Sequence, residues 1–210
     1  MKEMPNKKIY IIVISAGLML IVFWYFFGGG AAPKKHPAAG KNIIAFGDSL
    51  VEGIGASPEN NFVSLLSKKL GIDIINAGFG GDTTASALDR LSQDVLSRNP
   101  KIVIVLVGGN DAIRRIRKEE TFKNLETIID RVQEKGAGVL LVGIQSGFFR
   151  DNYKKDFSAL ARQKGAWHVP DILDGIFAHP DLMYDTIHPN DKGYQIIADR
   201  LEPVLREMLR

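Results

Sequence analysis

The sequence predicts an α/β fold: a three-layer α/β/α sandwich with a central, mostly five-stranded parallel sheet, preceded by an N-terminal transmembrane helix. Two observations predict the sandwich. Short apolar runs alternate with helix-length amphipathic segments, and several of these runs are apolar throughout, as strands covered on both faces are. A long apolar stretch without a charged residue, near the N-terminus, predicts the transmembrane helix.

The apolar stretch spans residues 9–27. As a helix it would extend about 28 Å, close to the hydrocarbon thickness of a bilayer, and it lacks the polar stripe of a soluble amphipathic helix. Trp24 and Tyr25 near its end suit the headgroup interface, and the lysines of the basic segment 1–8 favour a cytoplasmic N-terminus. We therefore predict a single-pass signal anchor in a bacterial inner membrane, with the remaining chain on the periplasmic side.

The residues after the apolar stretch leave a second fate open. Small residues at 28–32 offer a place where a signal peptidase could cut, and the protein would then be secreted. Residues 28–40 are rich in Gly, Ala, Pro and Lys, cannot bury a core, and are predicted to form a flexible linker. The folded domain is therefore predicted to span residues 41–210.

Within this domain the alternating pattern predicts each element in order. The strands are expected at residues 42–46, 73–76, 102–107, 138–143 and 167–169. The first long helix is expected to start with Ser57 as its cap and Pro58 at its first position, and to end at Gly71. The other helices are expected at residues 83–97, 119–135, 151–163 and 190–209. Parallel strands joined by right-handed helical crossovers give the sandwich.

The composition limits what the domain can bind. The 27 basic and 24 acidic residues are interspersed, so nucleic acid is not indicated as a partner despite a net charge of +3. The chain has no cysteine, which excludes disulfides and thiolate zinc sites, and no His/Asp/Glu cluster has metal-ligand spacing. We expect no metal and no cofactor, and the sequence leaves the oligomeric state open.

Ser49 stands in the loop after the first predicted strand, within Gly47-Asp48-Ser49-Leu50. In an open α/β sheet, ligands bind at the carboxyl ends of the strands, so Ser49 is a candidate nucleophile. The alternative is that Asp48 and Ser49 turn the chain and cap the next helix.

Two further strand exits can supply hydrogen-bond donors. The glycine-rich loop 76–83 precedes a helix, and its backbone N–H groups could face an anion, although such a loop can also be a plain turn. Asn110 follows the third strand in Gly108-Gly109-Asn110-Asp111, where its amide could donate into the crevice or cap the next element.

His188 precedes the last helix and has an aspartate, Asp185, three residues before it. This carboxylate can fix the tautomer of the imidazole so that the other ring nitrogen accepts a hydroxyl proton. The remaining histidines are expected to be structural or solvated: His36 lies in the linker, His168 in a strand, and His179 has no carboxylate three residues earlier.

Together these blocks resemble the four signature blocks of the SGNH, or GDSL, hydrolases, and they occur in family order from Ile43 to the final helix. The chain looks like the bacterial thioesterase, lysophospholipase and arylesterase branch, with a flavodoxin-like sheet. The resemblance implies that Ser49 attacks an ester carbonyl, His188 accepts its proton and Asp185 orients His188. It also implies an oxyanion hole made by the backbone N–H groups of Ser49 and Gly81 and the side-chain amide of Asn110. No G-x-S-x-G nucleophile elbow occurs.

The sequence says less about the substrate. Phe148, Phe149 and Met183 are expected to line an apolar acyl groove, with Tyr153 and the neighbours of Met183 beside them, or alternatively to pack the sandwich. Three arginines could attract an anionic group or form a solvated face: Arg114, Arg115 and Arg117.

Three functions remain open at this point. The first is a membrane-anchored serine hydrolase that cleaves carboxylic esters or thioesters with an apolar acyl group, such as a lipid ester. The second is an O-acetylesterase that acts on cell-surface glycans. The third is a tethered ligand-binding domain without turnover.

Overall fold

The computed structural model describes residues 40–145 and 153–210. The predicted anchor at 9–27, most of the predicted linker and the two phenylalanines Phe148 and Phe149 lie outside the described residues. Within the described ranges, none of the helices combines the length and the apolar character needed to cross a membrane.

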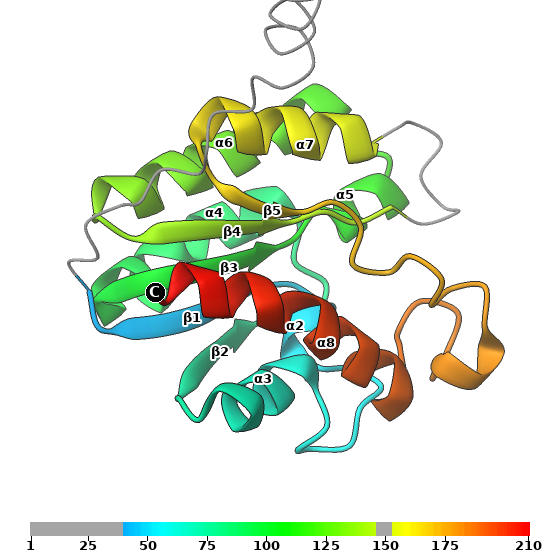
Figure 1. The fold of residues 1–210 in the computed structure, drawn as a ribbon. Helices are drawn as coiled ribbons and strands as arrows, with labels where there is room; N and C mark the ends of the chain where they lie inside the picture. Colours follow the sequence, from blue (N-terminus) through cyan, green and yellow to red (C-terminus); the bar gives the residue numbers. More distant parts are fainter. Residues whose placement is uncertain (1–39, 146–152) are drawn as a thin grey trace, which may run out of the picture. The chain divides into compact units, whose positions relative to one another are not determined.

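The core of the domain is a five-stranded parallel sheet (Figure 1). Its strands follow the order β2-β1-β3-β4-β5, which is the flavodoxin-like order. The strands are β1 (Asn42–Gly47), β2 (Ile74–Gly78), β3 (Pro100–Leu106), β4 (Gly138–Val142) and β5 (Trp167–Val169). Each lies within two residues of its predicted bounds, so the predicted α/β class and the parallel sheet are confirmed.

Helices cover both faces of this sheet (Figure 1). Along β1, Ile43 and Ala45 belong to the apolar core beneath one helical layer, whereas Ile44 and Phe46 belong to the core beneath the other, as the period of two in a strand requires. The first layer contains α3 (Phe62–Leu70) and α8 (Asp191–Met208). The second contains α4 (Thr84–Asp94), α6 (Lys118–Glu134) and α7 (Tyr153–Lys164).

The strand order determines where a crevice opens. The chain passes from β1 to β2 on one side and then returns to β3 on the other, so connections leave the carboxyl ends of β1 and β3 in opposite directions. Ligands of open α/β sheets bind at such a switch point. Two short helices start there, α2 (Ser49–Glu52) after β1 and α5 (Gly109–Ile113) after β3.

The structure differs from the predicted elements at several helix ends. The first long helix, α3, starts at Phe62 with Asn61 as its cap, so the predicted start at Ser57 is wrong. Ser57 instead bonds to Asp191 through its backbone N–H and its hydroxyl, both at 2.7 Å. The helix does end at Gly71, which has a left-handed φ of 67°. Both α2 and α5 were missed because a helix of one turn shows no periodicity in a sequence.

Candidate active site

Ser49 is the first residue of α2 and follows directly on β1. The strand ends at Gly47, where an added Cβ would lie 1.8 Å from the carbonyl oxygen of Leu106, so no larger residue fits. Asp48 caps α2, because its Oδ1 accepts the backbone N–H of Leu50 at 3.0 Å. The cap interpretation therefore holds for Asp48, and the Ser49 hydroxyl is left at the mouth of the crevice.

The Ser49 hydroxyl lies against His188. Their Oγ and Nε2 atoms are 3.0 Å apart. On the other side of the ring, Nδ1 of His188 lies 2.8 Å from Oδ2 of Asp185. Serine, imidazole and carboxylate thus form a continuous hydrogen-bonded chain, although 139 sequence positions separate Ser49 from His188.

Asp185 is held as an anion by its own loop. Its Oδ1 accepts the backbone N–H groups of Ile187 and His188, both at 2.7 Å. Desolvation alone would raise the pKa of Asp185, but the hydrogen bonds from the ring and backbone of His188 and from Ile187 outweigh it and hold the pKa below its usual value. The carboxylate is therefore ionised in the range where an imidazole titrates.

The segment that carries His188 is fastened to the segment that follows Ser49. Asp191, three residues after His188, accepts the two hydrogen bonds from Ser57 and a third from Asn60 Nδ2 at 3.0 Å. Tyr194 adds a hydrogen bond of 2.8 Å from its hydroxyl to the carbonyl of Ile54. These contacts fix the distance between the two segments.

Of the three predicted oxyanion donors, Ser49 and Asn110 line the same pocket, and Arg114 Nη2 ties Gly81 to the segment that follows Asn110. Within the part of the chain that the structure describes, the backbone N–H groups of Ser49 and Gly81 donate no hydrogen bond. Asn110 Nδ2 donates one proton to the carbonyl of Asp82 at 2.9 Å, which leaves its second N–H available. Gly81 has a φ of 82°, a conformation that favours glycine.

Buried carboxylates hold these donor loops in place. Asp111, fully buried, accepts the backbone N–H of Thr84 at 2.8 Å and so ties the Asn110 segment to the start of α4. Asp82 Oδ2 accepts a hydrogen bond from Nε of Arg90. The Nη2 atom of the same arginine donates to the carbonyl of Gly47 at 2.8 Å. The role of Asp111 was not predictable from the sequence, because its partner Thr84 lies 27 positions away.

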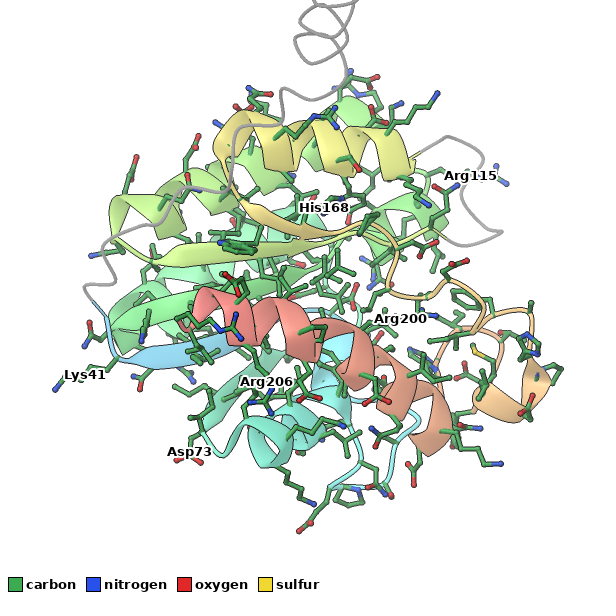
Figure 2. The ribbon with its side chains drawn as sticks, viewed as in Figure 1. Lys41, Asp73, Arg115, His168, Arg200 and Arg206 are labelled. Atoms are coloured by element: carbon green, nitrogen blue, oxygen red, sulfur yellow. The ribbon has the colours of Figure 1, made fainter. Side chains whose placement is uncertain are left out.

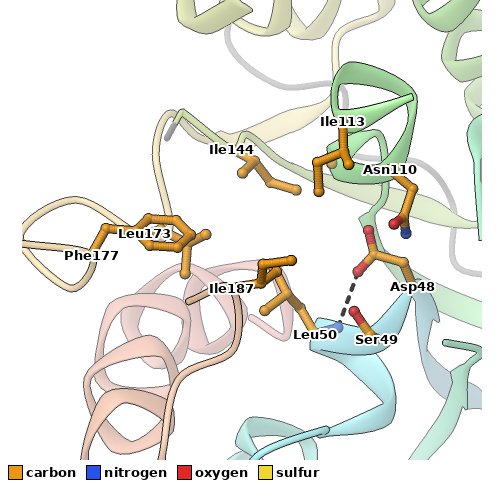
Figure 3. A pocket seen from close by; sticks show the side chains of 10 residues that line it. Asp48, Ser49, Leu50, Asn110, Ile113, Ile144, Leu173, Phe177 and Ile187 are labelled. Atoms are coloured by element: carbon orange, nitrogen blue, oxygen red, sulfur yellow. Dashed lines mark hydrogen bonds between the residues drawn. The ribbon is translucent and has the colours of Figure 1, made fainter. Parts of the chain in front are cut away.

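A pocket adjoins Ser49 and contains about 420 Å³ of empty space, part of it open to solvent (Figure 3). Its walls are mainly apolar. Ten residues line it: Asp48, Ser49, Leu50, Gly109, Asn110, Ile113, Ile144, Leu173, Phe177 and Ile187. The five apolar residues beyond Leu50 were not predicted. Only Ile113 and Ile144 had positions in the sequence that could have suggested a place in the pocket, because they follow the ends of β3 and β4 within seven residues.

The predicted groove residues lie elsewhere or are not described. Met183 packs against the apolar core beside α8 and does not line the pocket among the described residues. Tyr153 is buried and its ring centroid lies 5.6 Å from that of Phe122, which agrees with the alternative that this aromatic packs the sandwich. Phe148 and Phe149 fall outside the described residues.

The arginines after Asn110 are exposed. Arg114 Nη2 donates to the carbonyl of Gly81 at 2.9 Å, so this guanidinium braces the glycine-rich loop. Arg115 points outward (Figure 2).

The other described histidines are not part of the site. His168, in β5, makes contacts of 2.8 Å to the carbonyl of Leu141 and 3.1 Å to Ser158 Oγ, and burial lowers its pKa. His179 is exposed before the short 3₁₀ turn Pro180–Leu182. Within the described ranges, no group of three or more His, Asp or Glu residues could hold a metal ion.

Asp48 is the most perturbed carboxyl group of the site. It is 2% exposed. Burial is the largest cause that raises its pKa to about 7; the hydrogen bond from Leu50 opposes it, and the nearby carboxylates of Asp82 and Asp111 add to it. Near neutral pH this carboxyl group is therefore present in both protonation states.

A parallel α/β/α sandwich with a serine, an imidazole and a carboxylate in contact at the carboxyl edge of its sheet is an architecture of the serine-hydrolase class. The profile of the GDSL-like Lipase/Acylhydrolase family matches residues 45–196, and the chain belongs to this family. It is therefore an enzyme that hydrolyses ester bonds.

Known proteins resemble the chain over most of its length. Esterase TesA of Pseudomonas aeruginosa is 30% identical over 183 residues, which cover 82% of this chain and 91% of that protein. Thioesterase 1/protease 1/lysophospholipase L1 of Escherichia coli K12 is 29% identical over 180 residues, covering 82% of this chain and 86% of that protein. A crystal structure of TesA matches with a TM-score of 0.75 and 29% identity, covering 80% of this chain and 99% of that chain.

Proposed function

We propose that this enzyme is a membrane-anchored serine esterase of carboxylic esters or thioesters, with Ser49 as nucleophile, His188 as general base and Asp185 as the group that orients His188. The observation that carries the proposal is the chain of contacts from Ser49 Oγ to His188 Nε2, at 3.0 Å, and from His188 Nδ1 to Asp185 Oδ2, at 2.8 Å.

In this mechanism, Ser49 Oγ attacks the ester carbonyl carbon while its proton moves to Nε2 of His188. The anionic carboxylate of Asp185 stabilises the imidazolium that forms. His188 then gives the proton to the leaving alcohol or thiol, the carbonyl–leaving-group bond breaks, and an acyl ester on Ser49 remains. A water molecule, deprotonated by His188, attacks this ester and releases the acid and the free serine.

The negative charge that develops on the carbonyl oxygen would be received by the N–H groups of Ser49 and Gly81 and by the amide of Asn110. The free backbone donors support this role. Asn110→Ala is expected to lower kcat about 10²- to 10³-fold. Asn42→Ala is the matched control, because Asn42 lies outside the pocket and its Nδ2 donates to the carbonyl of Arg98 at 2.7 Å. Equal rates in the two variants would refute the oxyanion role of Asn110.

The substrate assignment rests on the pocket walls and on the relatives. Ile113, Ile144 and Phe177 offer an apolar surface beside Ser49, which suits an acyl chain. The names of the two relatives, esterase and thioesterase/lysophospholipase, agree with acyl esters and acyl thioesters as the substrate class.

The decisive experiment uses the full chain in detergent with 4-nitrophenyl butanoate and a fluorophosphonate probe. We expect Ser49→Ala to abolish both hydrolysis and labelling. Ser97→Ala is the control, because the Ser97 hydroxyl is exposed and donates a hydrogen bond of 2.6 Å to the carbonyl of Gln93. If Ser49→Ala still hydrolysed the ester at the wild-type rate, the proposal would fail. A folded wild-type protein that hydrolysed the ester but was not labelled by the probe would also contradict a nucleophilic Ser49.

We also propose that residues 9–27 anchor the protein in the inner membrane with its hydrolase domain on the periplasmic side. The sequence has no cysteine, so a single cysteine reports on its own position. In Lys135→Cys, at an exposed position after α6, a membrane-impermeant maleimide should label the protein in cells whose outer membrane has been permeabilised. Labelling only after lysis would place the domain in the cytoplasm, and a shortened N-terminus in the medium would indicate cleavage and secretion.

A further inference from the structure

Asp48 has a carboxylate oxygen without a partner. Its side chain is almost completely buried, at 2% exposed. Oδ1 accepts the N–H of Leu50, and the backbone N–H of Asp48 itself also acts on the carboxyl group, but no other residue within the described ranges donates a hydrogen bond to Oδ2. A buried polar atom without a partner is costly, so Oδ2 is expected to bind water or a ligand group.

This oxygen belongs to the pocket beside Ser49. Asp48 is one of the residues that line the pocket, and its carboxyl group points into it in Figure 3. At Gly109, an added Cβ would lie 3.6 Å from Oδ2 of Asp48 and 3.8 Å from Cδ1 of Ile144. The missing side chain of Gly109 therefore leaves room where the polar oxygen meets the apolar wall.

No cation neutralises the carboxyl group within the described ranges. The acidic side chains that act on it are Asp82 and Asp111, and the buried hydroxyl of Tyr194 lies in its field. The nearby guanidinium of Arg90 forms salt bridges with Asp82 and Asp94 instead of Asp48. Asp48 can therefore lose or keep its proton near neutral pH, so Oδ2 can act as an acceptor or as a donor.

A wholly apolar acyl chain would remove water from Oδ2 without replacing its hydrogen bond. A hydroxyl group would replace it in either protonation state, since a hydroxyl both donates and accepts. Asp48 and Ser49 line the same pocket, and their consecutive Cα atoms are about 3.8 Å apart, so we expect a group that reaches Oδ2 to lie near the carbonyl carbon that Ser49 attacks.

We infer that Asp48 Oδ2 is a polar subsite of the acyl pocket, and that the enzyme favours acyl groups with a hydroxyl on the second or third carbon. This inference rests on the proposed function, since it assigns the acyl part of the substrate to this pocket. It makes Asp48 a specificity-determining residue rather than a member of the proton-transfer chain.

The test compares kcat/KM for the 4-nitrophenyl esters of butanoic, 2-hydroxybutanoic and 3-hydroxybutanoic acids, using the full chain. Asp48→Ser keeps a side chain that can cap α2 but removes the second oxygen, whereas Asp48→Asn keeps both the cap and a donor in place of Oδ2. We expect the preference for one hydroxyacyl ester over the butanoyl ester to fall about ten-fold in Asp48→Ser. In Asp48→Asn it should stay within about three-fold of the wild type.

A pH series separates this contact from a structural role. The ester of 3-methoxybutanoic acid can only accept a hydrogen bond. In the wild type its kcat/KM relative to that of the butanoate ester should therefore fall as the pH rises from 6 to 8, because Asp48 loses the proton that it donates. In Asp48→Asn this ratio should stay constant.

Equal ester preferences in wild type and Asp48→Ser, or a methoxy ratio that does not change with pH, would overturn the inference. The proposed function fails differently, by persistence of butanoate hydrolysis in Ser49→Ala. Gly109→Ala gives a further check if Asp48→Ser does not fold, because its methyl group should block the approach to Oδ2 and lower the hydroxyacyl preference while Asp48 stays intact.

Discussion

Ser49 and His188 meet at one edge of the sheet, but the segments that carry them are held in different ways. Ser49 follows β1, an interior strand of the sheet, and its neighbours Leu50 and Val51 are buried in the core. The segment of His188 lies at the surface: the side chain of Asp185 is 43% exposed, and hydrogen bonds through Asp185 and Asp191 hold the segment. Apolar packing thus positions Ser49, whereas polar contacts position His188.

This difference predicts that substitutions near Ser49 lower stability, whereas substitutions near His188 lower activity. A polar contact at the surface contributes little to folding, but it can set the distance between two reacting groups to within an ångström. Four substitutions test this contrast, and the most damaging one comes first.

His188→Ala is expected to lower kcat at least about 10⁴-fold, because no other group contacts the Ser49 hydroxyl within the described residues. The melting temperature should change by less than about 3 °C, since the polar contacts of His188 to Ser49 and Asp185 contribute little to folding. His179→Ala, at an exposed position outside the site, is the matched control. A large loss of stability in His188→Ala would contradict the contrast.

Asp48→Asn tests the buried side of the comparison through pH. Burial raises the pKa of Asp48 in the folded protein to about 7 from its ordinary value of 3.8, so between these values the folded protein holds a proton that the unfolded chain releases. Its contribution to stability therefore falls as the pH rises. Relative to Asp48→Asn, the wild type should lose about 3 kcal/mol of unfolding free energy between pH 5 and pH 8, measured by urea denaturation. Parallel curves for the two proteins would show that Asp48 ionises normally.

Val51→Ala should lower the unfolding free energy by about 2 kcal/mol, because Val51 is fully buried beneath α3 and α8. The kcat of the protein that remains folded should stay within about three-fold of the wild type at 20 °C. Urea denaturation and initial rates on 4-nitrophenyl butanoate measure the two effects. If Val51→Ala kept the wild-type stability but lost most of its kcat, the proposed contrast between the two segments would be wrong.

Asp191→Ala should lower kcat about ten-fold and leave KM nearly unchanged, because the His188 segment loses its three hydrogen bonds to Ser57 and Asn60. Asp191→Asn, which keeps part of this bonding, should recover much of the rate. Asp199→Ala is the control on the same helix, since Asp199 pairs with Lys69 at 2.8 Å away from the site. If Asp191→Ala and Asp199→Ala had the same kcat, Asp191 would have no positioning role.

The fold was predictable because its signals are local. The apolar run of β3 and the amphipathic face of α6 each lie within one window of sequence, and parallel strands need such helices as crossovers. The start of α3 was missed for a related reason: Ser57 and Pro58 look like a cap, but the partner that engages Ser57 is Asp191, far along the chain.

Residue type and order along the chain were enough to predict the fold class, the family, and the polar residues that follow the strands. The apolar side chains that surround Ser49 could be identified only once the chain was folded. Ile144, Phe177 and Ile187 come from separate loops, and nothing local distinguishes them from core residues such as Met183. The folded structure also decided the state of Asp48, since a pKa depends on the burial and charges that surround a group in space, not on its neighbours in sequence.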